Sequence, residues 1–348
     1  VGNVRGIDVD IVYPVTKEWI RKYTRGLGDK QSIITAYYNN YVKPIVDFLA
    51  RKGVKLYVSV DREGIHISSS EWTAHARIHP FYFTFKGAKK ILPKLNPYFS
   101  EQASHFLRII LEKHGDEIRG FKSLLDVMES DIGEQMKIHK STKENIVRGI
   151  YLLTSTGLFN VKAERDSLKE VLSSGYRVVV FDLYNSEMND FAQKVLIYYV
   201  LDRIFSYREA QMRAGKLEDR AIIIIDEAHK FFPSSKGSEE DTNYVRRVAG
   251  KIALMMRLGR RRKIGFVFAT HNPNDLSEII VQLSNNKVVF RTKPEVAESF
   301  GLSRAEALVL SRERNGVAYY ISPWLRESKI KIRVPIPPPL GHYDLSRS

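Results

Sequence analysis

Residues 221–229 read Ala-Ile-Ile-Ile-Ile-Asp-Glu-Ala-His, and this stretch decides the fold. Four consecutive isoleucines bounded by polar residues are typical of a central parallel strand that is buried on both faces. Asp226 and Glu227 follow the isoleucines directly. In folds built on parallel strands, ligands bind at the carboxyl ends of those strands. The sequence therefore predicts two carboxylates at the ligand-binding edge of a parallel sheet.

The same strand, with its Asp-Glu end, has the Walker B arrangement of nucleotide-hydrolysing proteins. In that arrangement Asp226 holds Mg²⁺, directly or through water, and Glu227 orients the water that attacks the γ-phosphate of ATP. The alternative is a core strand that simply ends in polar residues. We favour Walker B because the four isoleucines lead straight into Asp-Glu-Ala-His.

A second apolar run, residues 266–269, ends at Thr270 and His271. We expect these two side chains to lie beside the phosphates as a sensor pair. A basic cluster precedes the run and contains Arg257 and residues 260–262, all arginine. Arginines at a helix end are usually a solvated face, but they can also supply an arginine finger to the γ-phosphate of a neighbouring subunit.

Hydrophobic periodicity places the other elements. The predicted strands are 8–12, 32–36, 55–61, 177–182, 264–270, 287–291 and 316–321, and the predicted helices are 41–51, 100–114, 141–153, 190–214, 242–258 and 276–283. We interpret residues 32–61 as a β-α-β unit with parallel strands, in which Gly53 ends the helix. Residues 80–175 are mostly helical, which indicates a helical subdomain inserted after the second strand. Four prolines among residues 335–339 end regular structure.

Composition limits the class of protein. The 348 residues contain 55 Lys and Arg against 40 Asp and Glu, a formal net charge of +15, which favours a polyanionic partner. Nucleic acid is the first candidate, a membrane surface the second, and a soluble protein that is merely basic the alternative. The sequence has no cysteine, which excludes disulfides, thiolate metal sites and a Cys nucleophile and fits a cytoplasmic protein. No apolar stretch reaches the roughly 18 residues of a membrane span. Because the sequence begins with Val1, we expect further residues before it. A membrane anchor in that preceding segment stays one of the open alternatives.

Three histidines, His66, His75 and His79, lie close together in the sequence. His75 and His79 are four residues apart, a spacing that puts two imidazoles on one face of a helix. No acidic residue stands at a matching position. We therefore interpret them as surface or polar-network histidines rather than as a metal site.

Two segments, IIIIDEAHKFFP (residues 222–233) and LGRRRKIGFVFATHNPNDLSEIIVQLSNNKVVFRT (residues 258–292), resemble the HerA/FtsK/VirB4 group of ring ATPases, and its archaeal HerA-like branch most of all. Residues 141–160, 177–183 and 313–335 extend the resemblance over most of the chain. It implies an α/β fold: a RecA-like P-loop NTPase core, a mostly parallel sheet with flanking helices, and an inserted helical subdomain. The implied divisions are a first part of the core (1–79), the helical insertion (80–170), the rest of the core (171–334) and a Pro-rich tail (335–348).

The resemblance also implies roles for individual residues. Asp226 and Glu227 are the Walker B pair, and Thr270 and His271 occupy the sensor position, where the family usually has Gln. Arg257 and Arg260 are the expected arginine fingers. Further implied positions are Gln282, Asn286 and Arg291 on the next polar strip, an acidic turn at residues 61–64, and Lys230, Lys236, Arg246 and Arg247 as DNA contacts lining a ring pore.

A phosphate loop of the form Gly-x-x-x-x-Gly-Lys-Ser/Thr is missing from the sequence. Residues 26–32 come nearest, but Asp29 stands where the pattern needs Gly, and an acidic residue there would repel phosphate. Residues 37–40, between the predicted strand 32–36 and the helix 41–51, contain neither Gly nor Lys. Three explanations stay open: a loop missing from the printed sequence, a deliberate removal, or a family member that no longer hydrolyses ATP.

The sequence therefore predicts an ATP-driven ring motor of translocase or helicase type, acting on double-stranded DNA in end processing or DNA transfer. ATP and Mg²⁺ are the expected cofactors, and a homohexamer the expected assembly. A nuclease or a membrane DNA-transfer channel is the expected partner. The alternative is a catalytically inert basic ring or scaffold that binds DNA or an active paralogue, and a third reading is a DNA-binding protein that forms no ring.

Overall fold

The computed structural model describes residues 4–5, 8–70, 72–82, 84–96, 98–130, 138–159, 168–172, 178–183, 187–234 and 239–334, with backbone alone for residues 4–5, 72, 169–170 and 239–247. The chain forms two compact units, residues 1–218 and 219–348, which are described separately below. This division does not test the predicted boundaries at residues 80 and 170, which stay predictions. No helix in the described ranges combines the length and the apolar character that crossing a membrane requires.

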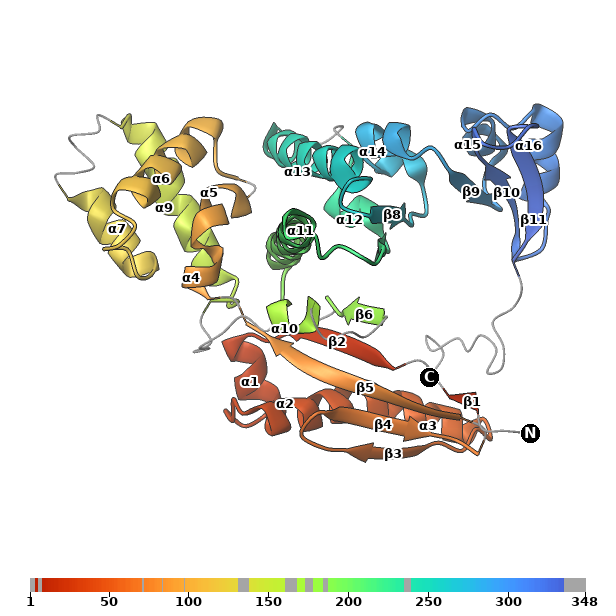
Figure 1. Ribbon diagram of the computed structural model, residues 1–348, viewed down its shortest axis with the longest axis horizontal. Helices are drawn as coiled ribbons and strands as arrows, with labels where there is room; N and C mark the ends of the chain where they lie inside the picture. Colours follow the sequence, from red (N-terminus) through yellow and green to blue (C-terminus); the bar gives the residue numbers. More distant parts are fainter. Residues whose placement is uncertain are drawn as a thin grey trace. The chain divides into compact units, whose positions relative to one another are not determined.

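The first unit is built on a six-stranded mixed sheet (Figure 1). Its strands are β1 (Val4–Arg5), β2 (Val9–Pro14), β3 (Tyr57–Val60), β4 (Gly64–Ser68), β5 (Trp72–Phe81) and β6 (Val178–Phe181). The main path runs β3-β4-β5-β2-β6, and β1 adds to β5. Strand β2 pairs in parallel with both β5 and β6, whereas β3, β4 and β5 pair antiparallel. The fold is therefore α/β with a parallel-rich sheet and flanking helices, as predicted.

One face of this sheet packs against α1 (Lys17–Tyr23), α2 (Lys30–Tyr37), a π-helical turn (Tyr38–Val42) and α3 (Lys43–Arg51). Trp19, Tyr13, Ile33 and Ile34 are fully buried in the core between them. The predicted strand at residues 32–36 is wrong, because these residues belong to α2. The side chain of Asp29 caps that helix by accepting the backbone N–H of Ser32, and this cap outweighs the β-branched character of Ile33 and Ile34.

The predicted β-α-β unit with parallel strands is also wrong. Strand β3 forms at the expected place, and Gly53 ends the preceding helix with φ +85°. However, β3 turns back through residues 61–63 into β4 and pairs with it antiparallel. The carboxylate of Asp61 accepts the N–H groups of Glu63 and Gly64 and so closes a tight turn. A turn this short permits only an antiparallel partner.

The rest of the first unit is helical. Its helices are α4 (Phe85–Ala88), α5 (Leu92–Leu95), α6 (Glu101–Lys113), α7 (Phe121–Glu129), α9 (Lys140–Ser155), α10 (Leu168–Leu172) and α11 (Asp190–Arg213), with a 3₁₀ turn at Lys89–Ile91. The predicted helices 100–114, 141–153 and 190–214 are confirmed. Helix α9 carries Gly149 against Phe99, and a methyl group there would lie 2.1 Å from that ring. The inner face of α9 is therefore fixed by close packing.

The second unit contains two small sheets. Strands β7 (Ala221–Ile225) and β8 (Ile264–Phe268) pair in parallel, with α12 (Ala228–Phe231), α13 (Glu239–Gly259), a 3₁₀ turn (Pro273–Asp275) and α14 (Glu278–Leu283) around them. Strands β9 (Lys287–Phe290), β10 (Val317–Ile321) and β11 (Lys329–Arg333) form an antiparallel sheet with α15 (Pro294–Ser299) and α16 (Arg304–Ser311). Strands β7, β8, β9 and β10, and helices α13 and α14, lie where the sequence predicts them, whereas no strand was predicted at the place of β11.

Burial of β7 differs from the prediction of a central strand covered on both faces. Ile222 and Ile224 are each 70% exposed, whereas Ile225 is buried. Among the described residues β7 has a single strand partner, β8. Successive side chains of a strand point to opposite faces, so within the second unit no element covers the face that carries Ile222 and Ile224. The Pro cluster at 335–339 lies outside the described residues.

Candidate functional site

The carboxyl ends of β7 and β8 lie side by side. Their parallel pairing aligns Ile225 with Phe268. Beyond the strands, the N–H of Ala269 donates to the carbonyl of Ile225 at 2.9 Å, and the N–H of Ala228 donates to the carbonyl of Ala269 at 2.8 Å. This extension of the ladder places residues 226–227 beside residues 270–271. The two polar strand ends that the sequence singled out therefore meet at one edge.

Glu227 has a left-handed backbone conformation, with φ 49° and ψ 42°. Residues other than glycine rarely adopt it, and such strain is concentrated at functional sites. The carboxylate of Asp226 accepts the backbone N–H of Glu227 at 3.0 Å and so supports the turn from β7 into α12. The turn directs the Glu227 side chain toward the end of β8.

Two imidazoles meet the Glu227 carboxylate. His271 Nε2 lies 2.7 Å from Glu227 Oε1, and His229 Nε2 lies 3.5 Å from Glu227 Oε2. The hydroxyl of Thr270 donates to the carbonyl of Asn272 at 3.1 Å and lies 3.2 Å from His229 Nδ1. Because the Thr270 proton is used by Asn272, its oxygen can accept from His229 Nδ1–H. Thr270 therefore orients His229, and the two imidazoles bracket the carboxylate.

The cluster is open to solvent on the His271 side. The side chain of His271 is 84% exposed, while those of Glu227 and His229 are 29% and 24% exposed. A water molecule or a phosphate can therefore reach the carboxylate, whose position is fixed by its neighbours. Such an arrangement can accept a proton from a bound water and hold that water in place.

Asp226 is exposed at the end of β7. In the described ranges no group of three His, Asp or Glu side chains could hold a metal ion by itself. Magnesium is usually bound by one or two carboxylates, with waters and substrate phosphates as the other ligands. The single carboxylate of Asp226 fits that mode of binding, in which the nucleotide supplies further ligands.

Several predicted site residues lie outside this cluster. Arg257, in the last turn of α13, and Arg260, just after it, are exposed, as is Lys230 on α12. Gln282 donates to Glu278 on its own helix α14. Asn286 accepts from Tyr320 and Ser322, and Arg291 donates to the carbonyl of Glu313. Lys236 and the side chains of Arg246 and Arg247 lie outside the described residues. The roles of all these residues stay predictions.

His229 is the residue that sequence reasoning missed, since it received no role beyond membership of the motif. The feature of the sequence that could have identified His229 is its position two residues after Glu227. There it lies at the start of α12, which follows directly on the end of β7. The three histidines of the first unit lie on strands rather than on a helix. His66 belongs to β4, and His75 and His79 belong to β5, where residues two apart share a face.

Neither candidate phosphate loop fits phosphate. At residues 26–32, the carboxylate of Asp29 accepts the hydroxyl of Ser32 at 2.6 Å and its N–H at 2.9 Å. These hydrogen bonds hold the pKa of Asp29 below its usual range, so a negative charge already occupies the start of α2. Residues 37–40 are not a loop, because the helix continues through them as the π-helical turn into α3.

Comparison with known proteins relates the chain to ATPases. Residues 171–292 match the family model "ATPase family associated with various cellular activities (AAA)". No curated protein matches the sequence. The fold is similar to that of the bacterial conjugative coupling protein TrwB, with a TM-score of 0.50 at 11% identity, over 75% of this chain and 74% of that one.

Two further solved structures are similar at lower scores. VirB4 of Thermoanaerobacter pseudethanolicus matches 72% of this chain and 68% of its own at 13% identity, with a TM-score of 0.49. The genome packaging NTPase B204 of Sulfolobus turreted icosahedral virus 2, in complex with ATP-gammaS, matches 50% of this chain and 74% of its own at 17% identity, with a TM-score of 0.32.

The matched range 171–292 contains β6, β7, β8 and the whole Glu227 cluster. The family match and the shared fold support the resemblance to the FtsK/HerA/VirB4 type of ATPase that the sequence suggests. They do not distinguish the archaeal HerA-like branch, which stays a prediction.

Proposed function

We propose that this chain supplies the water-activating side of an ATPase site in a DNA-translocating motor. The observation that carries the proposal is the Glu227 carboxylate, held in a left-handed turn at the carboxyl end of β7 with His271 at 2.7 Å. In this role Glu227 orients the water that attacks the γ-phosphate, and Asp226 holds the Mg²⁺ that accompanies ATP. When bound, Mg²⁺ neutralises charge that develops on the phosphates.

His271 and Thr270 fit the proposal as a sensor pair. In its doubly protonated form, the exposed imidazole of His271 can donate to a phosphate oxygen from Nδ1 while its Nε2–H stays in contact with Glu227. Thr270 orients His229 on the other side of the carboxylate. Loss of the γ-phosphate would therefore shift His271, and the contact between His271 and Glu227 would pass that shift to the Glu227 carboxylate.

The arginine finger belongs to the proposal because Arg257 and Arg260 are exposed at the end of α13. We propose that one of them stabilises transition-state charge on ATP bound to a neighbouring subunit of a homohexamer. An arginine of this kind contributes about 10³–10⁵-fold to turnover. Arg260→Ala should abolish turnover, and mixing it with Glu227→Gln subunits should restore part of it, because each variant supplies what the other lacks. Absence of any rescue would count against an arginine that acts in trans.

Double-stranded DNA is the proposed track. The net charge of +15 fits a phosphate backbone, and Lys230, Lys236, Arg246 and Arg247 are the proposed contacts. The similar structures include VirB4, the conjugative coupling protein TrwB and a genome packaging NTPase. We therefore propose DNA transfer or end processing as the process, with a membrane channel or a nuclease as partner.

The direct test is ATP hydrolysis by the purified protein with and without double-stranded DNA. Hydrolysis that DNA stimulates supports the motor. The absence of hydrolysis, with retained DNA binding and a large assembly, would support the alternative, a catalytically inert basic scaffold. The particle mass by light scattering separates both from a DNA-binding protein that forms no ring.

A companion measurement concerns the phosphate loop. Trypsin should release residues 31–51 as one peptide, QSIITAYYNNYVKPIVDFLAR, because Pro44 protects the bond after Lys43. That mass would show that the α2–α3 helix is uninterrupted in the protein. Peptides rich in Gly and Lys between the same flanks would instead identify a phosphate loop at this place and strengthen the motor.

A further inference from the structure

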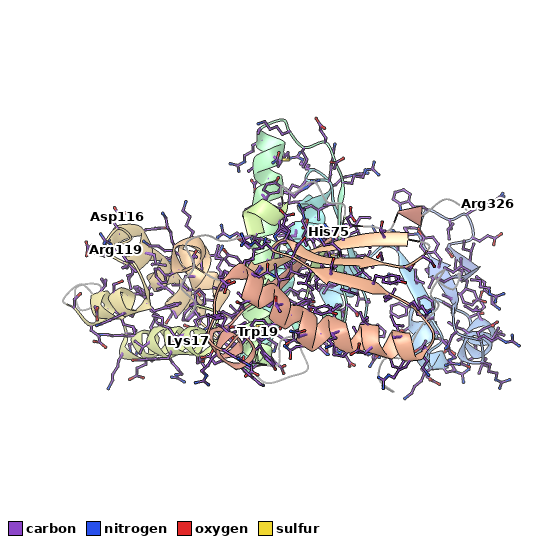
Figure 2. The ribbon with its side chains drawn as sticks, turned by 90° about the horizontal axis from the view of Figure 1, so that it is seen from below. Lys17, Trp19, His75, Asp116, Arg119 and Arg326 are labelled. Atoms are coloured by element: carbon purple, nitrogen blue, oxygen red, sulfur yellow. The ribbon has the colours of Figure 1, made fainter. Side chains whose placement is uncertain are left out.

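The β10–β11 hairpin carries an unusually exposed tryptophan. Trp324 is 80% exposed, the highest value among the large hydrophobic side chains of the described residues. It lies in the connection 322–328, and Pro323, Arg326 and Glu327 beside it are also exposed. Tryptophan and arginine are the residue types most enriched among interface residues that dominate binding energy. Figure 2 shows the Arg326 side chain pointing away from the strands.

The backbone of this tip is held in place by its own hydrogen bonds. Ser322 is buried, its hydroxyl donates to Asn286 at 2.6 Å, and it also accepts the N–H of Trp324 at 3.3 Å. The N–H of Ser322 donates to the carbonyl of Ser328, and that of Ser328 to the carbonyl of Leu325. Pro323 fixes the backbone between Ser322 and Trp324. A tip ordered before binding loses little conformational entropy when a partner engages it.

A matching surface lies on the outer face of α9. A shallow, open groove on this face is lined by Lys140, Lys143, Glu144, Val147, Arg148 and Tyr151, all of them residues of α9. Their spacing of three and four residues places them on one face of the helix. Tyr151 is 61% exposed. The groove thus offers an aromatic ring and an aliphatic side chain, flanked by cations that can lie over an indole.

Charge favours the same pairing. In the described residues no ion pair engages Arg326, Glu327, Glu144 or the three cations of the groove. Arg326 can pair with Glu144, and Glu327 can pair with Lys140, Lys143 or Arg148. A nucleic-acid phosphate is a poorer occupant for the tip, because Glu327 repels it beside Arg326.

We infer that the Trp324 hairpin of one copy docks into the α9 groove of a second copy of this chain. The tip and the groove are different surfaces, so the contact is heterologous and each copy can serve as donor and acceptor at once. Repetition of the contact builds an open chain of copies, or a ring when the rotation closes. The inference extends the ring of the proposed function by naming a contact within it.

Light scattering of the full chain without nucleotide tests the contact. The unmodified protein should form assemblies, and Trp324→Ala and Tyr151→Ala should each weaken self-association at least about tenfold. Tyr57→Ala removes another exposed aromatic side chain, on β3, and should leave the assembly unchanged. An equimolar mixture of Trp324→Ala and Tyr151→Ala should form dimers but nothing larger, because that pair retains one intact tip and one intact groove.

A charge exchange provides the second test. Arg326→Glu and Glu144→Arg should each weaken association, and the double variant should recover most of it. A monomeric unmodified protein, or unchanged mass in every variant, overturns the inference. The inference is also overturned if Trp324→Ala keeps the particle mass of the unmodified protein but binds single-stranded DNA more weakly. That result would assign the tip to nucleic-acid binding. Because nucleotide is absent, these outcomes are independent of hydrolysis by the Glu227 site.

Discussion

Two regions of the molecule contain the same chemical pair with different surroundings. At the end of β7, Glu227 Oε1 lies 2.7 Å from His271 Nε2. At the β3–β4 turn, Asp61 Oδ2 lies 2.7 Å from His66 Nε2. The ring of His66 stacks on that of His75 on β5, with centroids 4.0 Å apart and planes within 3° (Figure 2 labels His75). A carboxylate–imidazole contact alone therefore does not identify a functional site.

The difference is what else holds the carboxylate. Asp61 also accepts two backbone N–H groups, from Gly64 at 2.9 Å and Glu63 at 2.8 Å, which together with His66 hold its pKa well below the usual range. It is fixed as a turn-closing anion. Glu227 contacts the side chains of His271 and His229 at the ends of two parallel strands. Its carboxylate is thus positioned but still available to a ligand.

The largest expected effect separates the two carboxylates by activity. Glu227→Gln should lower DNA-stimulated ATP hydrolysis by about 10²–10⁴-fold, because an amide cannot accept a proton from the attacking water. Nucleotide binding should remain. Asp61→Asn is the matched control and should leave turnover unchanged. Equal turnover of Glu227→Gln and the unmodified protein would remove Glu227 from the mechanism.

The second expected effect separates the two regions by packing. Gly64→Ala should destabilise the first unit by about 3 kcal/mol, because the new methyl group would lie 2.0 Å from the carbonyl oxygen of Ala76. Gly265→Ala on β8 meets nothing closer than 4.0 Å and should change stability by less than about 1 kcal/mol. Urea unfolding followed by circular dichroism measures both units, and the fluorescence of the buried Trp19 reports on the first unit. An unshifted midpoint for Gly64→Ala would contradict the close approach of β4 and β5.

A third effect tests whether His271 acts as a donor. His271→Ala should lower turnover about 100-fold, the scale seen for loss of one positioned donor. His271→Gln should stay within about tenfold of the unmodified protein, because an amide N–H can replace the imidazole N–H. His66→Gln, in the matching pair of the first unit, should not alter turnover. Equal losses for His271→Ala and His271→Gln would show that the imidazole itself is needed.

The smallest effect is a pH dependence of the first unit. Burial, followed by the charge of His66, lowers the pKa of His75 below its ordinary value of 6.5. As pH falls below 6.5, the unfolded chain takes up this proton before the folded one, so stability falls. Asp8, Asp61 and Arg77 also act on His75. Thermal unfolding between pH 7 and pH 5 measures the effect.

His75→Phe should flatten this pH dependence while it keeps a ring against His66. His105→Phe, at an exposed histidine on α6, is the control and should keep it. The lowered pKa of Asp61 acts in a separate window, since its contribution is lost only as pH falls below the ordinary value of 3.8. A pH profile that His75→Phe leaves unchanged would assign the dependence to other groups.

Local patterns predicted about half of the helices and strands, those that local interactions decide, and missed others such as β4 and β5. Helices α6 and α11 begin where Ser100 and Asn189 accept the N–H groups of Ala103 and Ala192. The isoleucine run gave β7, and an apolar run gave β8. The error at α2 arose because the β-branched residues were interpreted as a strand and Asp29 was not considered as a helix cap. The error at β3 arose because pairing direction was inferred from a helix before the strand rather than from the turn after it.

The sequence by itself determined the kind of element at every predicted segment except residues 32–36, the polar ends of β7 and β8, and the basic character of the protein. Each of these depends on residue type and on spacing along one segment. Only the tertiary structure decided that His229 and His271 bracket Glu227 and that, within the second unit, β8 is the single described strand partner of β7. Those outcomes depend on the register between segments up to about 40 residues apart, such as Thr270 and His229 with |i−j| of 41, and no local periodicity records that register.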